Sequence, residues 1–303
     1  MVIGYANVGR FGLAHSLLAW ARCKLWCDDR GFPMLSPSWF NVRIGPYLRL
    51  ERDKRQYHRY FQFPGYISGL KKLYYLGFME KVNAEEVNLP QIQNEQSICV
   101  TFNNRLALNE ETHFPEIIGR NEHVKRALLS MTRPEYRPKF FNFDHVAVHI
   151  RMGDFLPMVT LDAVRSGAKN VQLPVSWYAE MLNGIRSRLG YTIPALVYSD
   201  GSNSQLEAIL KLDNVTRAGA QPAVTDLLSI SSANMLISSG SGFSMWGCYL
   251  GNIPRVCFPG QRLFRVLGAA SSVDLEPEAE SVAALTDEFF YVVQNSIQAQ
   301  PRN

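Results

Sequence analysis

The sequence lacks an apolar run of the ~18–20 residues that a bilayer-spanning helix needs. Its first residues, Met-Val-Ile-Gly-Tyr-Ala, show no basic segment of the kind that opens a secretory signal. Cysteine is scarce: the five cysteines are odd in number and scattered, with no Cys-x-x-Cys pair or histidine partner. We therefore expect no disulfide scaffold and no zinc site, and a reducing, cytoplasmic setting.

Charge is also limited, with 19% charged residues and a formal net charge of +4. That balance is too weak to indicate nucleic acid, but it suits an anionic ligand or membrane surface. The apolar fraction of 47% is ordinary for a folded protein and excludes disorder. At roughly 150 residues per domain, the 303 residues predict about two domains.

The hydrophobic pattern predicts an α/β fold. Residues 2–6 form a strand, residues 7–12 a loop with glycines that do not fit Gly-x-Gly-x-x-Gly, and residues 14–30 a helix ended by Gly31. A helix at 121–131 precedes a stretch with two prolines at 132–138, where we place the domain boundary. Further strands are predicted at 146–150, 195–199, 235–238 and 255–258, and helices at 176–189, 204–212, 243–250 and 281–297.

This alternation predicts a mainly parallel sheet with ligands at the carboxyl ends of its strands. The domains expected are 1–132, 139–280 and a carboxy-terminal helix and tail at 281–303. Residues 42–72 stand apart, with eight basic residues against two acidic ones and six interleaved tyrosines and phenylalanines. They predict a surface that faces an anionic acceptor or the cytoplasmic leaflet, unless they form an ordinary solvated helix with an apolar underside.

Two strand ends carry the chemistry. Strand alternation places His149 and Arg151 on one side, and a turn at Gly153 can bring Asp154 to the same cleft. A guanidinium there suits a diphosphate. The alternative is a local Arg151–Asp154 ion pair beside a structural histidine.

The second strand end, residues 237–247, runs through serines and glycines directly into a helix. The hydroxyls of Ser241 and Ser244 and the free backbone N–H groups at the helix start are suited to an anion. The alternative is a serine N-cap followed by tight helix packing through Gly247.

These motifs resemble the α-1,2-fucosyltransferases, family 11 of the glycosyltransferases. His-Ile-Arg-Met-Gly-Asp-Phe at 149–155 is similar to the family's His-x-Arg-Arg-Gly-Asp-Tyr, and 237–247 is similar to its Ile-Ser-Asn-Ser-x-Phe-Ser-Trp-Trp-Gly. Matches to Pro-x-x-Tyr-Tyr at 174–178, Phe-Ser-Asp-Asp at 198–201, Asp-x-x-x-Met-Ser from Asp226 and the amino-terminal glycine loop at 9–18 follow the family's order.

The resemblance implies a GT-B-like fold, with two Rossmann-type domains, an interdomain cleft and a carboxy-terminal helix that packs back. It implies an inverting, metal-independent glycosyltransferase that moves L-fucose from GDP-fucose to a glycan hydroxyl, in α-1,2 linkage, for surface polysaccharide or O-antigen synthesis. The acceptor would be a glycan or a lipid-linked oligosaccharide, and the enzyme would be cytoplasmic or peripheral at the inner face of the membrane. The sequence has no Asp-x-Asp motif to hold a metal, and no cofactor beyond the donor is expected.

The resemblance also implies residue roles. Arg151 would clamp the leaving diphosphate, and a phosphate site would be completed by Ser241, Phe243 and Ser244. Contacts to ribose and guanine would come from His149, Asp200 and Asp226, and Gly12 would line the donor site. Asp154 would be the general base, with His15 as the alternative.

The chain departs from the family's pattern at Met152, Gly201, Met245 and His15-Ser16. These departures motivate a second hypothesis, the same fold with another nucleotide-sugar donor. A third hypothesis belongs to another class, a non-catalytic module that binds nucleotide or glycan.

Overall fold

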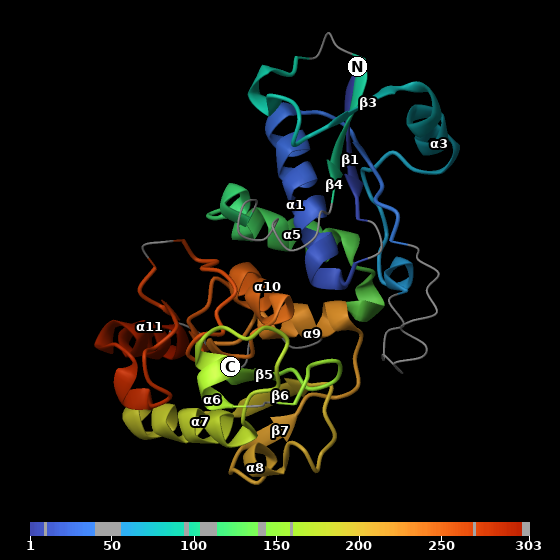
Figure 1. The fold of residues 1–303 in the computed structure, drawn as a ribbon. Helices are drawn as coiled ribbons and strands as arrows, with labels where there is room; N and C mark the ends of the chain where they lie inside the picture. The colour runs from blue at the N-terminus through green and yellow to red at the C-terminus, as the bar shows by residue number, and fades with distance from the viewer. Residues whose placement is uncertain are drawn as a thin grey trace. The chain divides into compact units, whose positions relative to one another are not determined.

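The computed structural model describes residues 1–8, 11–39, 56–93, 97–103, 114–138, 144–157, 160–268 and 271–298. The chain divides into two compact units, Met1–Arg137 (unit 1) and Pro138–Asn303 (unit 2) (Figure 1). Within the described ranges, no helix has both the length and the apolar character to cross a membrane.

Unit 1 is built on a parallel sheet in the order β2-β1-β4-β3. Its strands are β1 (Val2–Asn7), β2 (Met34–Leu35), β3 (Glu80–Asn83) and β4 (Ile98–Asn103). The order puts β1 and β4 in the centre, and both are largely buried, whereas β3 at one edge is partly exposed.

Helices cover both faces of this sheet (Figure 1). On one face lies α1 (Leu13–Arg30), so close to β1 that a Cβ at Gly4 would overlap the sulfur of Cys27. Gly31 ends α1 in the left-handed conformation, with φ of 66°, as its position in the sequence predicts. The other face is covered by α3 (Gly69–Phe78). Unit 1 also contains α5 (Asn121–Met131) and 3₁₀ turns at Tyr57–Arg59, Leu89–Gln91, Phe114–Ile117 and Pro134–Tyr136.

Unit 2 is built on a parallel sheet of six strands in the order β10-β9-β8-β5-β6-β7. The strands are β5 (Val146–Ile150), β6 (Ala195–Ser199), β7 (Val215–Arg217), β8 (Met235–Ser238), β9 (Arg255–Cys257) and β10 (Asp274–Leu275). The central strands β5 and β8 are buried along their whole length, as the apolar runs in the sequence predict.

The helices of unit 2 enclose this sheet. They are α6 (Leu161–Arg165), α7 (Val175–Leu189), α8 (Glu207–Leu210), α9 (Ala223–Ile230), α10 (Gly242–Gly251) and α11 (Asp287–Gln298), with a 3₁₀ turn at Val282–Ala284. The last helix, α11, buries Phe289, Val293 and Ile297 in the core of unit 2 itself. The α/β class with parallel sheets is confirmed, whereas the interdomain cleft stays a prediction.

Two predicted helices are wrong in extent. The helix predicted at 281–297 is a 3₁₀ turn followed by α11, because the hydroxyls of Ser281 and Thr286 each accept a backbone N–H and start a separate element. The helix predicted at 204–212 is reduced to α8, because side chains at its predicted start bond backbone N–H groups, such as Gln205 to Ser202. The strands β5, β6 and β8 are correct to the residue.

Candidate active site

The candidate site lies at the carboxyl edge of the unit 2 sheet. Because β5 pairs with β6 on one side and with β8 on the other, all in parallel, the segments that follow these three strands meet at one edge. Those segments contain Arg151 to Asp154 after β5, Asp200 after β6, and Ser239 to Ser244 after β8. The two strand-end motifs of the sequence are therefore neighbours in space.

Arg151 stands between two carboxylates. Its Nη2 atom donates to Asp154 Oδ1 at 2.6 Å, and its Nη1 atom donates to Asp200 Oδ2. The guanidinium also lies over the ring of Phe155, 5.7 Å from its centroid. The ion pair that the sequence offers as an alternative to a phosphate role is thus present, and Asp200 joins it.

The two carboxylates are held unequally. Asp200 also accepts the backbone N–H of Met152 at 2.8 Å, and a Cβ at Gly153 would overlap its carboxylate. The loop that follows β5 therefore packs directly against Asp200. Asp154 lies on the exposed part of the same loop and is paired with Arg151. The predicted contact of Asp200 with ribose or guanine stays a prediction, because here its carboxylate faces Arg151.

His149 heads a second, buried cluster. Its Nδ1 atom is 2.5 Å from the hydroxyl of Ser244 and 3.0 Å from that of Ser239, and Ser241 is at 3.4 Å. The ring of Phe243 packs against the imidazole, with centroids 5.1 Å apart. This arrangement brings together four of the residues that the sequence singles out and joins the end of β5 to the start of α10.

The environment of His149 favours the neutral imidazole. Burial lowers its pKa to about 4, and the neighbouring Arg151 acts in the same direction, partly offset by Asp200. The side chain is 6% exposed. At neutral pH His149 therefore serves as an uncharged hydrogen-bond partner of the serines and not as a phosphate-binding cation.

Ser241 caps α10. Its hydroxyl accepts the backbone N–H of Ser244 at 3.3 Å. Gly240, just before the cap, is pressed against Gln261, whose backbone oxygen lies 3.0 Å from where a Cβ would stand. Gly247 packs even more closely on Ile230 of α9, so the N-cap and the tight packing of the alternative interpretation are both present.

Asp226 occupies a different place, on α9. Its charge acts with burial to raise the pKa of the Tyr198 phenol, which places the carboxylate near β6. Its predicted role in guanine binding stays a prediction.

The two predicted site residues of unit 1 lie at the start of α1. Gly12 is its N-cap, and open space surrounds the position where its Cβ would be. The ring of His15 stacks on Phe11, with centroids 6.2 Å apart. Gly9 and Arg10 of the same loop lie outside the described residues, and the roles of Gly12 and His15 stay predictions.

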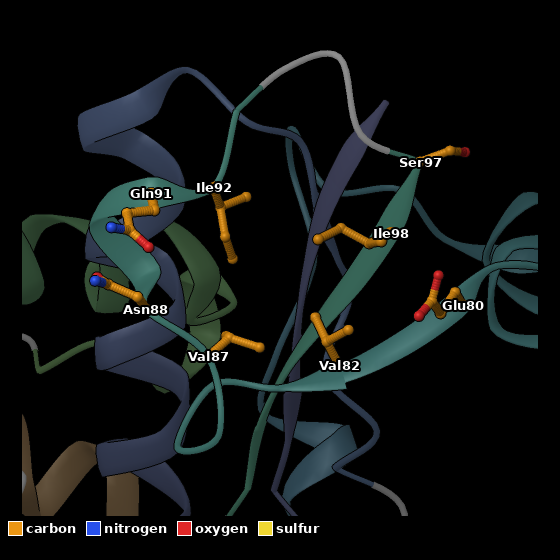
Figure 2. A pocket seen from close by; sticks show the side chains of 8 residues that line it. All are labelled: Glu80, Val82, Val87, Asn88, Gln91, Ile92, Ser97 and Ile98. Atoms are coloured by element: carbon orange, nitrogen blue, oxygen red, sulfur yellow. The ribbon is translucent and has the colours of Figure 1, made fainter.

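A separate pocket in unit 1 lies away from these residues. It has a volume of about 580 Å³ and opens beside the starts of β3 and β4, at Glu80 and Ile98, whereas Gly12 and His15 follow the end of β1 (Figure 2). Figure 2 shows the aliphatic side chains that line it: Val82, Val87, Ile92 and Ile98. In a parallel sheet, ligands bind at the carboxyl ends of the strands, so this pocket is not a candidate donor site.

Sequence reasoning missed two residues of the site. Ser239, 3% exposed, contacts His149 Nδ1 and also donates its backbone N–H to the carbonyl of His149. Gln172 donates to the carbonyls of Met152 and Phe155, both at 3.0 Å, and so holds the Arg151 loop. Ser239 could have been found from its place in the serine run, whereas no local signal marks Gln172.

Over the ranges that the structure describes, no three histidine, cysteine or acidic side chains gather in a way that could hold a metal ion. Metal independence remains a prediction that a chelation experiment can test.

No protein-family model matches the sequence, and no curated protein is found as a relative. Among solved structures, fucosyltransferase NodZ from Bradyrhizobium is similar, with 12% identity and a TM-score of 0.49 over 84% of this chain and 93% of that one. A variant of Arabidopsis thaliana FUT1 in complex with GDP has 9% identity and a TM-score of 0.47, over 84% of this chain and 70% of that one.

POFUT1 in complex with GDP has 10% identity and a TM-score of 0.39, over 84% of this chain and 97% of that one. At such identities and TM-scores these likenesses do not establish a reaction or a substrate for this chain. The function has to be inferred from its own residues.

Proposed function

We propose that this chain is a glycosyltransferase that binds a nucleotide-sugar donor at the carboxyl edge of the unit 2 sheet, with GDP-fucose as the first candidate donor and a glycan hydroxyl as acceptor. One observation carries the proposal. Arg151, which forms the Arg151 cluster with Asp154 and Asp200, follows β5, and the serine-capped start of α10 follows the neighbouring strand β8. A cation and a helix N-terminus therefore lie side by side. Both features favour a diphosphate.

The ion pairs of Arg151 do not prevent phosphate binding. The side chains of Arg151, Asp154 and Asp200 are each about one-third exposed, and an exposed pair contributes only ~0–1 kcal/mol. A bidentate, charge-assisted contact with phosphate is stronger. We infer that the donor's diphosphate takes the guanidinium edge that Asp154 now occupies, while Asp200, anchored by the N–H of Met152, keeps Arg151 in place.

That exchange gives Asp154 its role in the reaction. Once released, its carboxylate is unpaired beside the diphosphate and can accept the proton of the acceptor hydroxyl. The acceptor oxygen then bonds to the anomeric carbon from the face opposite the diphosphate. The bond from that carbon to the phosphate oxygen breaks with its electron pair on the nucleoside diphosphate, and the configuration inverts.

The neutral His149 serves this step indirectly. By engaging the hydroxyls of Ser239 and Ser244, it fixes the loop that delivers the N–H groups of α10 to the leaving phosphate. A donor group held in advance at the site of developing charge contributes most to such a step.

The nucleotide is tested by thermal unfolding with GDP, UDP and dTDP. A ligand present at ~100 times its dissociation constant stabilises the folded protein by roughly 2.7 kcal/mol, so the preferred nucleotide raises Tm visibly. The departures at Met152 and Gly201, which lie against each other here, motivate the second donor hypothesis. If UDP or dTDP raises Tm and GDP does not, GDP-fucose is excluded.

Catalysis is tested by measuring hydrolysis of GDP-fucose in water and transfer of fucose to glycan acceptors. Both reactions are measured in the presence and in the absence of EDTA. Transfer that EDTA does not inhibit supports the metal-independent reaction, and inhibition contradicts it. Tight GDP binding with neither hydrolysis nor transfer supports the non-catalytic module.

We further propose a cytoplasmic, inverting α-1,2-fucosyltransferase of surface-polysaccharide or O-antigen synthesis, with a glycan or lipid-linked oligosaccharide acceptor and a peripheral place at the inner face of the membrane. All five cysteines are free and buried, which supports a reducing compartment. The predicted surface at 42–72 falls partly outside the described residues, since residues 40–55 are not among them. Linkage analysis of the product tests the α-1,2 assignment.

A further inference from the structure

Helix α3 is unusual in unit 1 because none of its residues is buried. Its inward side is partly buried against the sheet. That side consists of Tyr75, Leu76 and, just past the helix end, Met79, packed against Ile3, Leu35 and Cys99. The helix is therefore attached through one side, and its other side faces away from the sheet.

The outward side of α3 is a continuous apolar stripe. Leu70 is 84% exposed, Leu73 64%, Tyr74 59% and Phe78 78%. At about 100° per residue, spacings of three and four place these four side chains on one face of the helix. The rings of Tyr74 and Phe78 are 5.0 Å apart and form one surface.

Such clustering is not the ordinary scatter of apolar residues on a protein surface. Of the nine large hydrophobic residues that are exposed in the described part of the chain, four lie on this ten-residue helix. Single exposed hydrophobic residues need no explanation, whereas a contiguous patch marks an interaction site.

The charges around the stripe indicate its partner. Lys71 beside it and Lys81 on β3 are exposed, whereas Lys72 is turned inward and donates to Ser38 at 2.8 Å. The chain leading into α3, residues 42–72, has eight basic residues against two acidic ones, although the whole chain has a net charge of only +4. The remainder of the chain is slightly acidic, so the positive charge is concentrated in this part of the sequence.

We propose that α3 is a membrane-docking helix, which lies flat on an anionic bilayer with Leu70, Leu73, Tyr74 and Phe78 inserted among the headgroups. Ten residues of helix measure about 15 Å, too short to span a bilayer but suited to lying in the interface. Basic residues strengthen binding to an anionic surface. This proposal does not depend on the transferase reaction.

A second copy of the chain fits the stripe less well. Two copies joined through α3 would bring Lys71 and Lys81 against their own equivalents, which repel one another. An anionic lipid surface attracts the same charges.

The test is co-sedimentation with vesicles of phosphatidylcholine alone and of phosphatidylcholine with phosphatidylglycerol. We expect the wild-type chain to sediment with the anionic vesicles, and less so as salt is raised. The triple variant Leu70→Ser, Leu73→Ser, Phe78→Ser should bind them at least ~10-fold more weakly, because binding scales with inserted apolar area. The double variant Lys71→Glu, Lys81→Glu should lose the preference for anionic lipid.

The matched control removes two other exposed aromatic rings, Tyr191→Ser and Tyr291→Ser, and should bind as the wild type does. Thermal unfolding and gel filtration complete the experiment. The proposal is overturned if the wild-type chain does not bind anionic vesicles, or if the control variant and the triple variant lose vesicle binding equally. It is also overturned if the triple variant unfolds at a much lower temperature, which would show the stripe to be packed within the chain, or if it converts a dimer to a monomer. GDP binding by the triple variant should be unchanged whatever the outcome for the transferase.

Discussion

The two clusters at the carboxyl edge of the unit 2 sheet are adjacent, but they differ in charge and in burial. The Arg151 cluster is charged and partly exposed, with one carboxylate that has few other contacts. The His149 cluster is neutral and buried, and its hydroxyls are 2.5–3.4 Å from a single nitrogen. The first can exchange partners at little cost, and the second cannot.

The Arg151 cluster is therefore suited to respond to a ligand, and the His149 cluster is suited to hold the site in place. An exposed ion pair contributes ~0–1 kcal/mol, whereas an unsatisfied buried polar group costs ~1–3 kcal/mol. Substitutions in the two clusters should therefore separate: those around Arg151 should change function with little effect on stability, and those around His149 should change stability.

The largest effect is expected for Arg151→Ala. Loss of a preorganised charge-stabilising donor should slow sugar transfer by ~100–1000-fold, while the free energy of unfolding changes by no more than about 1 kcal/mol. The measurements are the turnover of GDP-fucose and urea unfolding.

The control for Arg151→Ala is Arg188→Ala, which removes another exposed arginine paired with a carboxylate, Asp287, in unit 2. Near-normal turnover in Arg151→Ala would contradict the phosphate role. A large loss of stability would contradict the prediction that substitutions around Arg151 affect function and those around His149 affect stability.

The next effect concerns pH. The pKa of His149 is about 4 in the folded chain and 6.5 when unfolded, so between these values the unfolded chain binds more protons. Stability should therefore fall as the pH drops from about 6.5 to about 4, by on the order of 3 kcal/mol from this group. Urea unfolding over this range measures it. The variant His149→Gln should have a shallower slope, and an unchanged slope would show that His149 is not the group responsible.

A smaller effect is expected for Ser244→Ala. The fully buried hydroxyl contacts His149 Nδ1 at 2.5 Å, and its loss should lower the free energy of unfolding by about 1 kcal/mol. Ser187→Ala is the control, because that hydroxyl donates to a backbone carbonyl on the exposed side of α7. Equal losses of unfolding free energy in the two variants would mean that the buried hydroxyl stabilises the fold no more than an exposed one does.

The smallest effect is expected on GDP binding, for Asp154→Asn; sugar transfer by this variant should fall, because Asp154 is the proposed general base. If the donor's diphosphate displaces this carboxylate from Arg151, removing its charge should strengthen GDP binding a few-fold, up to ~5-fold for a pair worth ~1 kcal/mol. Asp162→Asn is the matched control, since Asp162 pairs with Arg165 at the same sequence spacing. Weaker GDP binding in Asp154→Asn would contradict the proposed exchange.

Much of unit 2 could be predicted from the sequence, because its central strands are short apolar runs and the predicted bounds of α7 and α10 lie within one residue of those observed, although α6 and α9 were not predicted. The short edge strands β7 and β10 were not predicted, since two or three residues carry no periodicity. In unit 1, β2, β3, β4 and α3 were missed. The pattern of α3 has apolar residues on both sides, and local spacing cannot say which side is covered.

Residue type and local spacing were enough to predict the α/β class. They were also enough to predict that a histidine, an arginine and a serine-rich helix start follow buried strands. Only the folded chain shows that β5 lies between β6 and β8, and hence that Asp200 pairs with Arg151 and Ser239 with His149. Strand order is set by packing between segments far apart in the chain, and no local pattern contains it.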